Sequence, residues 1–346
     1  MASEAPPFWW QRSGPQAWLL WPASLLYGAV AGSRMRHSRP KAFDVPVLCV
    51  GNLTVGGSGK TPVAIEIAQA ALARGLKPGF LSRGHGGAYR GARLVDVGRD
   101  TASLVGDEPL LLAAVAPAAV ARRRQAGLKL LTEIGCDFIV MDDGFQSRRV
   151  HFDHALIVVD ANRGVGNGHV LPAGPLRASL RIQIMQAGSF LVVGEGTGAD
   201  RIVRLAARAG KPVAHAQIAP RAPQVVAGRN VIAFCGIGDP ERFGRTLRDA
   251  GAHVVALHAY PDHHRYSQGV ARDLLRAAGK VGATLVTTAK DAVRLTGQHG
   301  ALSELAQASL VLEIGMRFAE GGGADAIIER TLDSYRGRKF ALSRRG

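Results

Sequence analysis

Short apolar runs alternate along most of the chain with amphipathic stretches of helical length. Five such runs, at residues 45–50, 79–82, 138–141, 155–159 and 190–193, are typical of buried strands. A helix is predicted directly after the first run, over residues 62–74, with Pro62 in its first turn. This alternation predicts an α/β fold with a mostly parallel sheet flanked by helices.

The pattern weakens at residues 219–228, where two prolines and poor periodicity predict a linker. Further strand-like runs follow near residues 230–234, 254–257, 284–287 and 310–312. We therefore predict three parts: an N-terminal segment at 1–36, a larger domain at 37–225, and a smaller C-terminal α/β domain at 226–346. Residues 336–345 carry five basic side chains and no acid, and we expect a tail there, either disordered or lying on a membrane.

The N-terminal segment is rich in aromatic side chains. All four tryptophans of the chain lie within its first 22 residues: Trp9, Trp10, Trp18 and Trp21. The strongly apolar part, residues 17–32, is shorter than the ~20 residues that a spanning helix needs and contains Pro22. The favoured interpretation is an interfacial helix, with the tryptophans and Tyr27 at headgroup depth and the following arginines facing anionic lipid. The alternatives are a helix that packs its aromatic face on the domain behind it and, less favoured, a single span.

The composition is that of an ordinary folded protein with an unusual charge. Lysine and arginine number 43 against 27 acidic residues, a net charge of +16 that attracts polyanions such as nucleic acid, anionic lipid or phosphorylated substrates. A general preference for arginine accounts for the charge equally well, so charge alone does not choose a partner. The three cysteines are not at metal-ligand spacing, and buried free thiols are expected.

A glycine-rich loop stands between the first predicted strand and the first predicted helix. Its residues are Gly56, Gly57, Ser58, Gly59, Lys60 and Thr61. Backbone N–H groups of such a loop wrap a phosphate, the lysine reaches the β and γ phosphates of ATP, and the threonine hydroxyl is a ligand of Mg²⁺. A strict phosphate loop has glycine where Thr54 stands, and the Gly56–Gly57 pair compensates for this departure.

Carboxylates follow the strand predicted at residues 138–141. Asp142 and Asp143 come at its end, where strands of a parallel sheet point at one crevice, so we expect them to face the loop and Mg²⁺. A second pair, Asp107 and Glu108, precedes Pro109. The local sequence predicts that Asp107 caps a helix with Pro109 in its first turn. A capping aspartate can also take part in catalysis, so the two roles are compatible.

The triplet Asp262-His263-His264 allows three interpretations from the residues alone. Adjacent histidines beside an aspartate bind metals, form acid–base pairs or stand in solvated loops. Without a partner elsewhere in the chain, the loop interpretation is favoured.

Taken together, these stretches resemble one family. The matching segments are YG at 27–28, VGNLTVGGSGKTP at 50–62, LSRG at 81–84, GDEP at 106–109, MDDGFQ at 141–146, LPAGPLR at 171–177, GIGDPERF at 236–243, DHH at 262–264 and TTAKDAV at 287–293. They resemble the tetraacyldisaccharide 4′-kinases, the lipid A 4′-kinases of Gram-negative bacteria, nearly from end to end. Thr54 in place of glycine is itself typical of that family.

The resemblance implies a P-loop NTPase-like kinase that transfers the γ-phosphate of ATP to the 4′-hydroxyl of a tetraacyldisaccharide 1-phosphate, giving lipid IVA. It also implies a monotopic or peripheral protein on the cytoplasmic face of the inner membrane, with an acylated disaccharide lipid and an anionic membrane surface as partners. No obligate protein partner is evident.

The resemblance also implies roles for individual residues. Asp107 would be the general base, with His263 orienting it, and Lys60 would act on the phosphates. The proposed Mg²⁺ ligands are Thr61, Glu108, Asp142 and Asp143. Gln146 would lie near the nucleotide, and Arg83, Arg124, Arg177 and His264 near the substrate. Ala178 and Ala289 stand where the family usually has glutamate.

Two other classes remain open at this point. A regulatory P-loop NTPase predicts hydrolysis without a lipid acceptor, and this chain has no clear N-K-x-D motif for reading guanine. A nucleic-acid-dependent ATPase rests only on the charge, because the aromatic-poor body has no stacking platform. We therefore expect no nucleic-acid partner.

Overall fold

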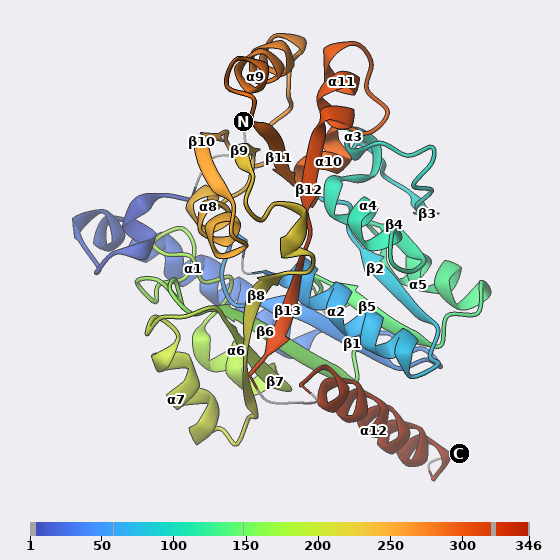
Figure 1. Cartoon of the computed structure of the whole chain (residues 1–346). Helices are drawn as coiled ribbons and strands as arrows, with labels where there is room; N and C mark the ends of the chain where they lie inside the picture. Colours follow the sequence, from blue (N-terminus) through green and yellow to red (C-terminus); the bar gives the residue numbers. More distant parts are fainter. Residues whose placement is uncertain (1–4, 58, 148, 320–322, 345–346) are drawn as a thin grey trace.

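The computed structural model describes residues 5–57, 59–147, 149–319 and 323–344, which fold around two sheets (Figure 1). The larger sheet has nine strands in the order β13-β8-β7-β6-β1-β5-β2-β4-β3. Only β3 and β13, at its two edges, run antiparallel to their neighbours. Its strands are β1 (Val47–Asn52), β2 (Pro78–Ser82), β3 (Ala92–Leu94), β4 (Ala118–Ala121), β5 (Phe138–Asp142), β6 (His154–Asp160), β7 (Ser189–Val193), β8 (Val213–Pro220) and β13 (Ile314–Phe318).

Both faces of the larger sheet are covered by helices, because successive side chains of each buried strand point to opposite sides. Leu48 and Val50 pack with α2, α4 and α12, whereas Val47 and Cys49 pack with α5, α6 and α7. The helices of this unit are α2 (Lys60–Ala73), α3 (Ala102–Val105), α4 (Asp107–Ala113), α5 (Arg124–Glu133), α6 (Leu180–Gln186), α7 (Asp200–Arg208) and α12 (Gly323–Ser343). The predicted mostly parallel α/β fold is confirmed.

The smaller sheet is parallel throughout, in the order β10-β9-β11-β12, and is also covered on both faces. Its elements are η2 (Pro223–Val225), β9 (Asn230–Cys235), α8 (Pro240–Asp249), β10 (His253–Ala259), α9 (Gln268–Val281), β11 (Thr284–Thr288), α10 (Ala289–Leu295), α11 (Ala301–Ala308) and β12 (Ser309–Leu312). The predicted linker is shorter than expected, because β8 continues to Pro220.

The chain returns to the larger sheet after β12. Strand β13 pairs with β8, and α12 then packs on α2 (Figure 1). The C-terminal unit predicted at 226–346 therefore includes two elements, at residues 314–318 and 323–343, that the structure places with the larger sheet. The alternative of a disordered tail from residue 336 is wrong as far as Ser343, because α12 continues to that residue and Arg338 pairs with Asp153 and Lys339 with Asp44.

The N-terminal segment forms η1 (Pro7–Trp10) and the long helix α1 (Pro15–His37). Small side chains face the body of the protein: Ala17 and Ser24 are buried, and a Cβ on Gly32 would come within 2.7 Å of the Ile182 side chain. The large apolar side chains face outward, namely Trp18, Leu19, Trp21, Leu25, Leu26, Tyr27 and Val30. The alternative in which the aromatic side chains pack on the domain applies to Trp9, whose indole N–H donates to the carbonyl of Pro172, and in part to Trp10, whose ring lies under the guanidinium of Arg163.

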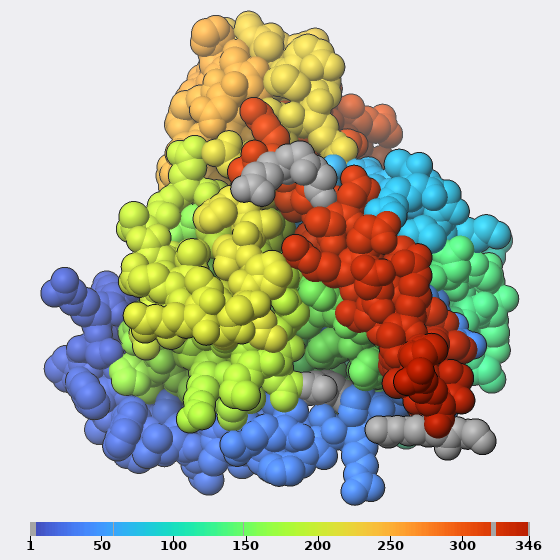
Figure 2. Space-filling view, turned by 90° about the horizontal axis from the view of Figure 1, so that it is seen from below, coloured from blue at the N-terminus to red at the C-terminus, as the bar shows by residue number. Residues whose placement is uncertain are grey.

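The outward face of α1 is the largest group of exposed apolar side chains on a single described element. In the space-filling view the N-terminal segment runs along one edge of the molecule (Figure 2). Within the described ranges, no helix has both the length and the apolar character that crossing a membrane requires.

Candidate active site

The glycine-rich loop connects β1 to α2 at the edge of the larger sheet where the parallel strands end. Gly56 and Gly59 have positive φ angles of 108° and 81°, which other residues rarely adopt, and Gly59 is the N-cap of α2. Lys60 and Thr61 open the helix, so the loop N–H groups and the positive end of the helix dipole meet at one point. Ser58, predicted as part of this loop, lies outside the described residues.

Asp142 ends β5 at the same edge, beside the end of β1. It is 1% exposed, and its Oδ1 atom has no hydrogen-bond partner among the described residues. Burial, followed by the nearby charge of Glu108, raises the pKa of Asp142 to about 7, whereas the charge of Lys60 opposes this rise. A buried carboxylate with an unpartnered oxygen between these charges is suited to bind a cation.

Asp143 follows in a left-handed conformation, with φ of 51°. Its carboxylate accepts hydrogen bonds of 3.0 and 3.2 Å from Nη1 of Arg177. Burial by itself raises the pKa of Asp143, but the charges of Lys60 and Arg177 outweigh it and leave the pKa below its usual value. Asp143 therefore stays ionised beside the phosphate loop.

Arg177 and Gln146 connect the phosphate loop to neighbouring segments. Arg177 donates from Nε to the carbonyl of Thr54 at 3.1 Å, and Gln146 donates to the carbonyl of Asn52 at 2.7 Å. Both predicted residues thus lie against the phosphate loop and the strand that leads into it.

Asp107 and His263 lie in contact although 156 residues separate them in sequence. His263 Nδ1 is 3.0 Å from Asp107 Oδ2, and this hydrogen bond raises the pKa of His263. His263 has a φ of 60°, a strained conformation for a residue other than glycine. Asp107 does not cap α4 as its local sequence predicted, because Gly106 occupies the N-cap position.

Two basic residues that the sequence interpretation did not single out complete this cluster. Lys290 Nζ is 3.1 Å from Oε1 of Glu108, and Arg294 pairs with Asp107 at 2.5 Å. Burial raises the pKa of Asp107, but the hydrogen bond from His263 and the charges of Lys290 and Arg294 hold it well below its usual range. Lys290 lies within the TTAKDAV segment and Arg294 directly follows it, and their place there was the only sequence indication of their importance.

Other predicted substrate residues occupy different positions. His264 stacks on Tyr260, whereas its neighbour His263 contacts Asp107. Arg124 is 3% exposed and donates to the main-chain carbonyls of Leu81, Asp142 and Asp143. Its contacts brace the ends of β2 and β5. Of the two departures from the family pattern, Ala178 is fully buried in the core and Ala289 begins α10.

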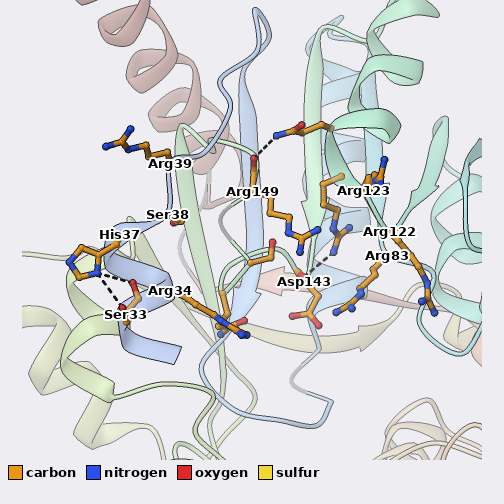
Figure 3. A pocket seen from close by; sticks show the side chains of 14 residues that line it. Ser33, Arg34, His37, Ser38, Arg39, Arg83, Arg122, Arg123, Asp143 and Arg149 are labelled. Atoms are coloured by element: carbon orange, nitrogen blue, oxygen red, sulfur yellow. Dashed lines mark hydrogen bonds between the residues drawn. The ribbon is translucent and has the colours of Figure 1, made fainter. Parts of the chain in front are cut away.

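A basic cavity of about 1130 Å³ opens between the end of α1 and the edge that carries Asp143 (Figure 3). Asp143 is the one acid among its described lining residues. Seven arginines line it: Arg34, Arg39, Arg83, Arg122, Arg123, Arg124 and Arg149. A second cavity of about 370 Å³ is lined by Asp107, His263 and Arg294 among others, so Asp107, although only 4% exposed, borders a cavity.

The described residues fit a magnesium site of the kind found beside phosphate loops. They contain no cluster of three or more histidine, cysteine, aspartate or glutamate side chains arranged for a metal. Mg²⁺ in nucleotide sites takes only one or two carboxylates, with waters and phosphates as its other ligands. The unpartnered Oδ1 of Asp142 agrees with that smaller requirement.

A parallel sheet with a phosphate loop, a carboxylate at the end of the adjacent strand and an Asp–His pair at the same edge defines a P-loop kinase. Residues 16–333 match the family described as tetraacyldisaccharide-1-P 4′-kinase. Proteins named tetraacyldisaccharide 4′-kinase are similar over nearly their whole length. The one from Agrobacterium fabrum is 52% identical, covering 98% of this chain and 97% of its own, and the one from Mesorhizobium japonicum is 51% identical, covering 98% and 99%.

A solved structure agrees with these matches. The crystal structure of the "apo" form of LpxK from Aquifex aeolicus in complex with ATP has a TM-score of 0.70 and 26% identity, covering 91% of this chain and 99% of that one. The chain belongs to the tetraacyldisaccharide-1-P 4′-kinase family.

Proposed function

We propose that this kinase transfers the γ-phosphate of ATP to the 4′-hydroxyl of a tetraacyldisaccharide 1-phosphate, giving lipid IVA, with Asp107 as the base. The observation that carries the mechanism is the 3.0 Å contact between Asp107 and His263 at the edge that holds the phosphate loop. The substrate class is supported by family membership and by the names of the relatives.

The chemical step forms one bond and breaks one. The sugar oxygen attacks the γ-phosphorus, the bond from that phosphorus to the β–γ bridging oxygen breaks, and ADP leaves. The hydroxyl proton passes to Asp107, and because a sugar hydroxyl has a pKa far above 7, this transfer occurs late. Lys60 and the loop N–H groups bind the charge that develops on the transferring group. His263 orients the carboxylate that accepts the proton.

Magnesium would be held by the Thr61 hydroxyl and the carboxylates of Asp142 and Glu108, with Asp143 beside them. When bound, it neutralises phosphate charge. In the described structure the ammonium of Lys290 lies on Glu108, so Glu108 becomes a ligand only once that contact is exchanged.

The basic cavity suits the phosphate that the substrate already carries. Arg83 and Arg149 extend into the space in front of Asp143, and Arg34 reaches it from the end of α1 (Figure 3). We propose that the 1-phosphate and the adjoining sugar occupy this cavity while the acyl chains remain in the membrane.

The exposed face of α1 supports a location on the cytoplasmic face of the inner membrane, as a peripheral or monotopic protein. A tetraacylated substrate leaves a bilayer only at high cost, since each buried CH₂ contributes about 0.8 kcal/mol. Because α1 ends at the basic cavity, its insertion brings that cavity to the headgroup layer.

The function is tested by following labelled phosphate from ATP, with Mg²⁺ present, in three parallel reactions. One contains vesicles with the tetraacyldisaccharide 1-phosphate, one contains nucleic acid, and one contains neither. We expect label on the lipid in the first reaction and only slow hydrolysis in the other two. Equal ATP turnover in all three, without labelled lipid, would contradict the proposal and favour a regulatory NTPase.

Replacing Trp18, Leu19 and Leu26 together with serine should weaken binding to anionic vesicles by at least about 100-fold, since burying each such side chain contributes ~1.5–3 kcal/mol. A matched control replaces three exposed apolar residues elsewhere, Val97, Val255 and Val281, with serine. Vesicle co-sedimentation measures the difference. If both triple variants bind vesicles as the unchanged protein does, α1 is not the membrane contact.

A further inference from the structure

Arg294 lies at the boundary between the two sheets. It stands on α10, in the smaller unit, and its side chain is only 7% exposed. Its Nε and Nη2 atoms donate to Oδ2 of Asp107, and Nη1 donates to Oδ1 of Asp291 and to the carbonyl of Gly236. Nη2 also lies 3.5 Å from Nδ1 of His263. The guanidinium therefore joins two nearly buried carboxylates, one from each unit.

The carboxylate of Asp291 is itself fixed within the smaller unit. It is fully buried and accepts hydrogen bonds from the backbone N–H of Gly236, the hydroxyl of Tyr266 and the hydroxyl of Thr288. Because Asp291 is fixed, the side chain of Arg294 that pairs with it has few alternative conformations. The Nε and Nη2 donors of Arg294 are therefore held facing Asp107.

One carboxylate oxygen of Asp107, Oδ2, contacts both Arg294 and His263. Oδ2 lies 3.1 Å from Nε and 2.5 Å from Nη2 of Arg294, and it also lies 3.0 Å from Nδ1 of His263. The other oxygen, Oδ1, accepts from the backbone N–H of Glu108. Arg294 therefore fixes which carboxylate oxygen faces the histidine.

We propose that Arg294 is the positioning residue of the reaction. It holds Asp107 and His263 in one geometry and makes that geometry depend on docking of the smaller unit onto α4. The inference rests on the proposed role of Asp107 as the base. An arginine is needed because its planar fork reaches both acids at once, whereas lysine offers a single point of charge.

A second ion pair between the same two units provides a matched control. Arg242 of α8 pairs with Asp160 at the end of β6 at 2.5 Å, and its other described side-chain partner is Asp239 rather than Asp107 or His263. If Arg294 only holds the units together, loss of Arg242 should lower turnover by a comparable amount. If Arg294 sets the orientation of Asp107, loss of Arg294 should lower turnover much more than loss of Arg242.

The test compares Arg294→Ala, Arg294→Lys and Arg242→Ala in the full chain, on vesicles that contain the lipid substrate. For Arg294→Ala we expect kcat to fall by about 10–100-fold, as for other residues that orient a reactive group, with KM for ATP changed less than about threefold. Arg294→Lys should lose nearly as much, and Arg242→Ala should keep kcat within about threefold. Added guanidinium should restore part of the activity of Arg294→Ala but not of Arg294→Lys, where the lysine fills the space.

Melting temperatures show whether each variant folds, and Arg294→Lys retains a cation at the site if Arg294→Ala does not fold. Unchanged kcat in both Arg294 variants, or an equal loss in Arg242→Ala, would overturn the inference. The Asp107→Asn variant distinguishes failure of this inference from failure of the proposed function. If Asp107→Asn turns over normally, the assignment of Asp107 as the base fails. If Asp107→Asn is inactive while Arg294→Ala is fully active, only the role of Arg294 fails.

Discussion

Replacing Asp107 with asparagine should lower kcat by about 10²–10⁴-fold, the usual contribution of a general base, while binding of ATP changes little. Asparagine has the same shape but cannot accept the hydroxyl proton. The side chain lies beside His263 and Arg294, outside the phosphate loop, so the nucleotide contacts stay in place. Steady-state kinetics on lipid-containing vesicles and a direct measurement of ATP binding check both parts.

The control for this substitution is Asp100→Asn. Asp100 is also a buried acid of the larger unit that pairs with an arginine, but its described partners are Arg93 and the backbone N–H of Asp96. Both variants lose a buried ion pair and should lose stability, yet only the first should lose turnover. A kcat for Asp107→Asn within about threefold of the unchanged protein would show that another group takes the proton.

The sequence was sufficient for the parts of the site that depend on local pattern. The phosphate loop is recognisable because glycines, lysine and threonine stand between a strand-like run and a helix-like run. Asp142 and Asp143 follow an apolar run, and in a parallel sheet that places them at the loop. His263 was different: its local sequence favoured a solvated loop, and only the family resemblance brought it to Asp107, where the structure also places it.

The positions that could not be predicted depend on long-range packing. Arg294 is one of many arginines in a chain of net charge +16, and nothing in its neighbourhood shows that a buried acid 187 residues away faces it. Arg124 illustrates the same difficulty, since its burial against main-chain carbonyls follows from the ends of β2 and β5. Strand β13 is five residues long, and its short apolar pattern does not identify β8 as its partner.

Replacing Lys60 with alanine should lower kcat by about 10²–10³-fold and also weaken ATP binding, because the ammonium acts on phosphate charge both in the bound nucleotide and during transfer. Lys60 also faces acids: its charge lowers the pKa of Asp143 and opposes the rise at Asp142. Its loss leaves the negative charge of these carboxylates less compensated at the site where phosphates bind. Lys77→Ala, at the residue directly before β2, is the control and should leave both quantities unchanged.

Thermal unfolding with and without Mg-ATP distinguishes the two central residues. A ligand that binds only the folded protein raises its melting temperature, so Asp107→Asn should keep the ATP-dependent rise and Lys60→Ala should lose most of it. The phosphate loop and the Asp–His pair would then act at separable stages, nucleotide binding and acceptance of the proton. A lost rise in Asp107→Asn would instead mean that Asp107 supports the nucleotide site, and a full rise in Lys60→Ala would mean that the loop N–H groups hold the phosphates without it.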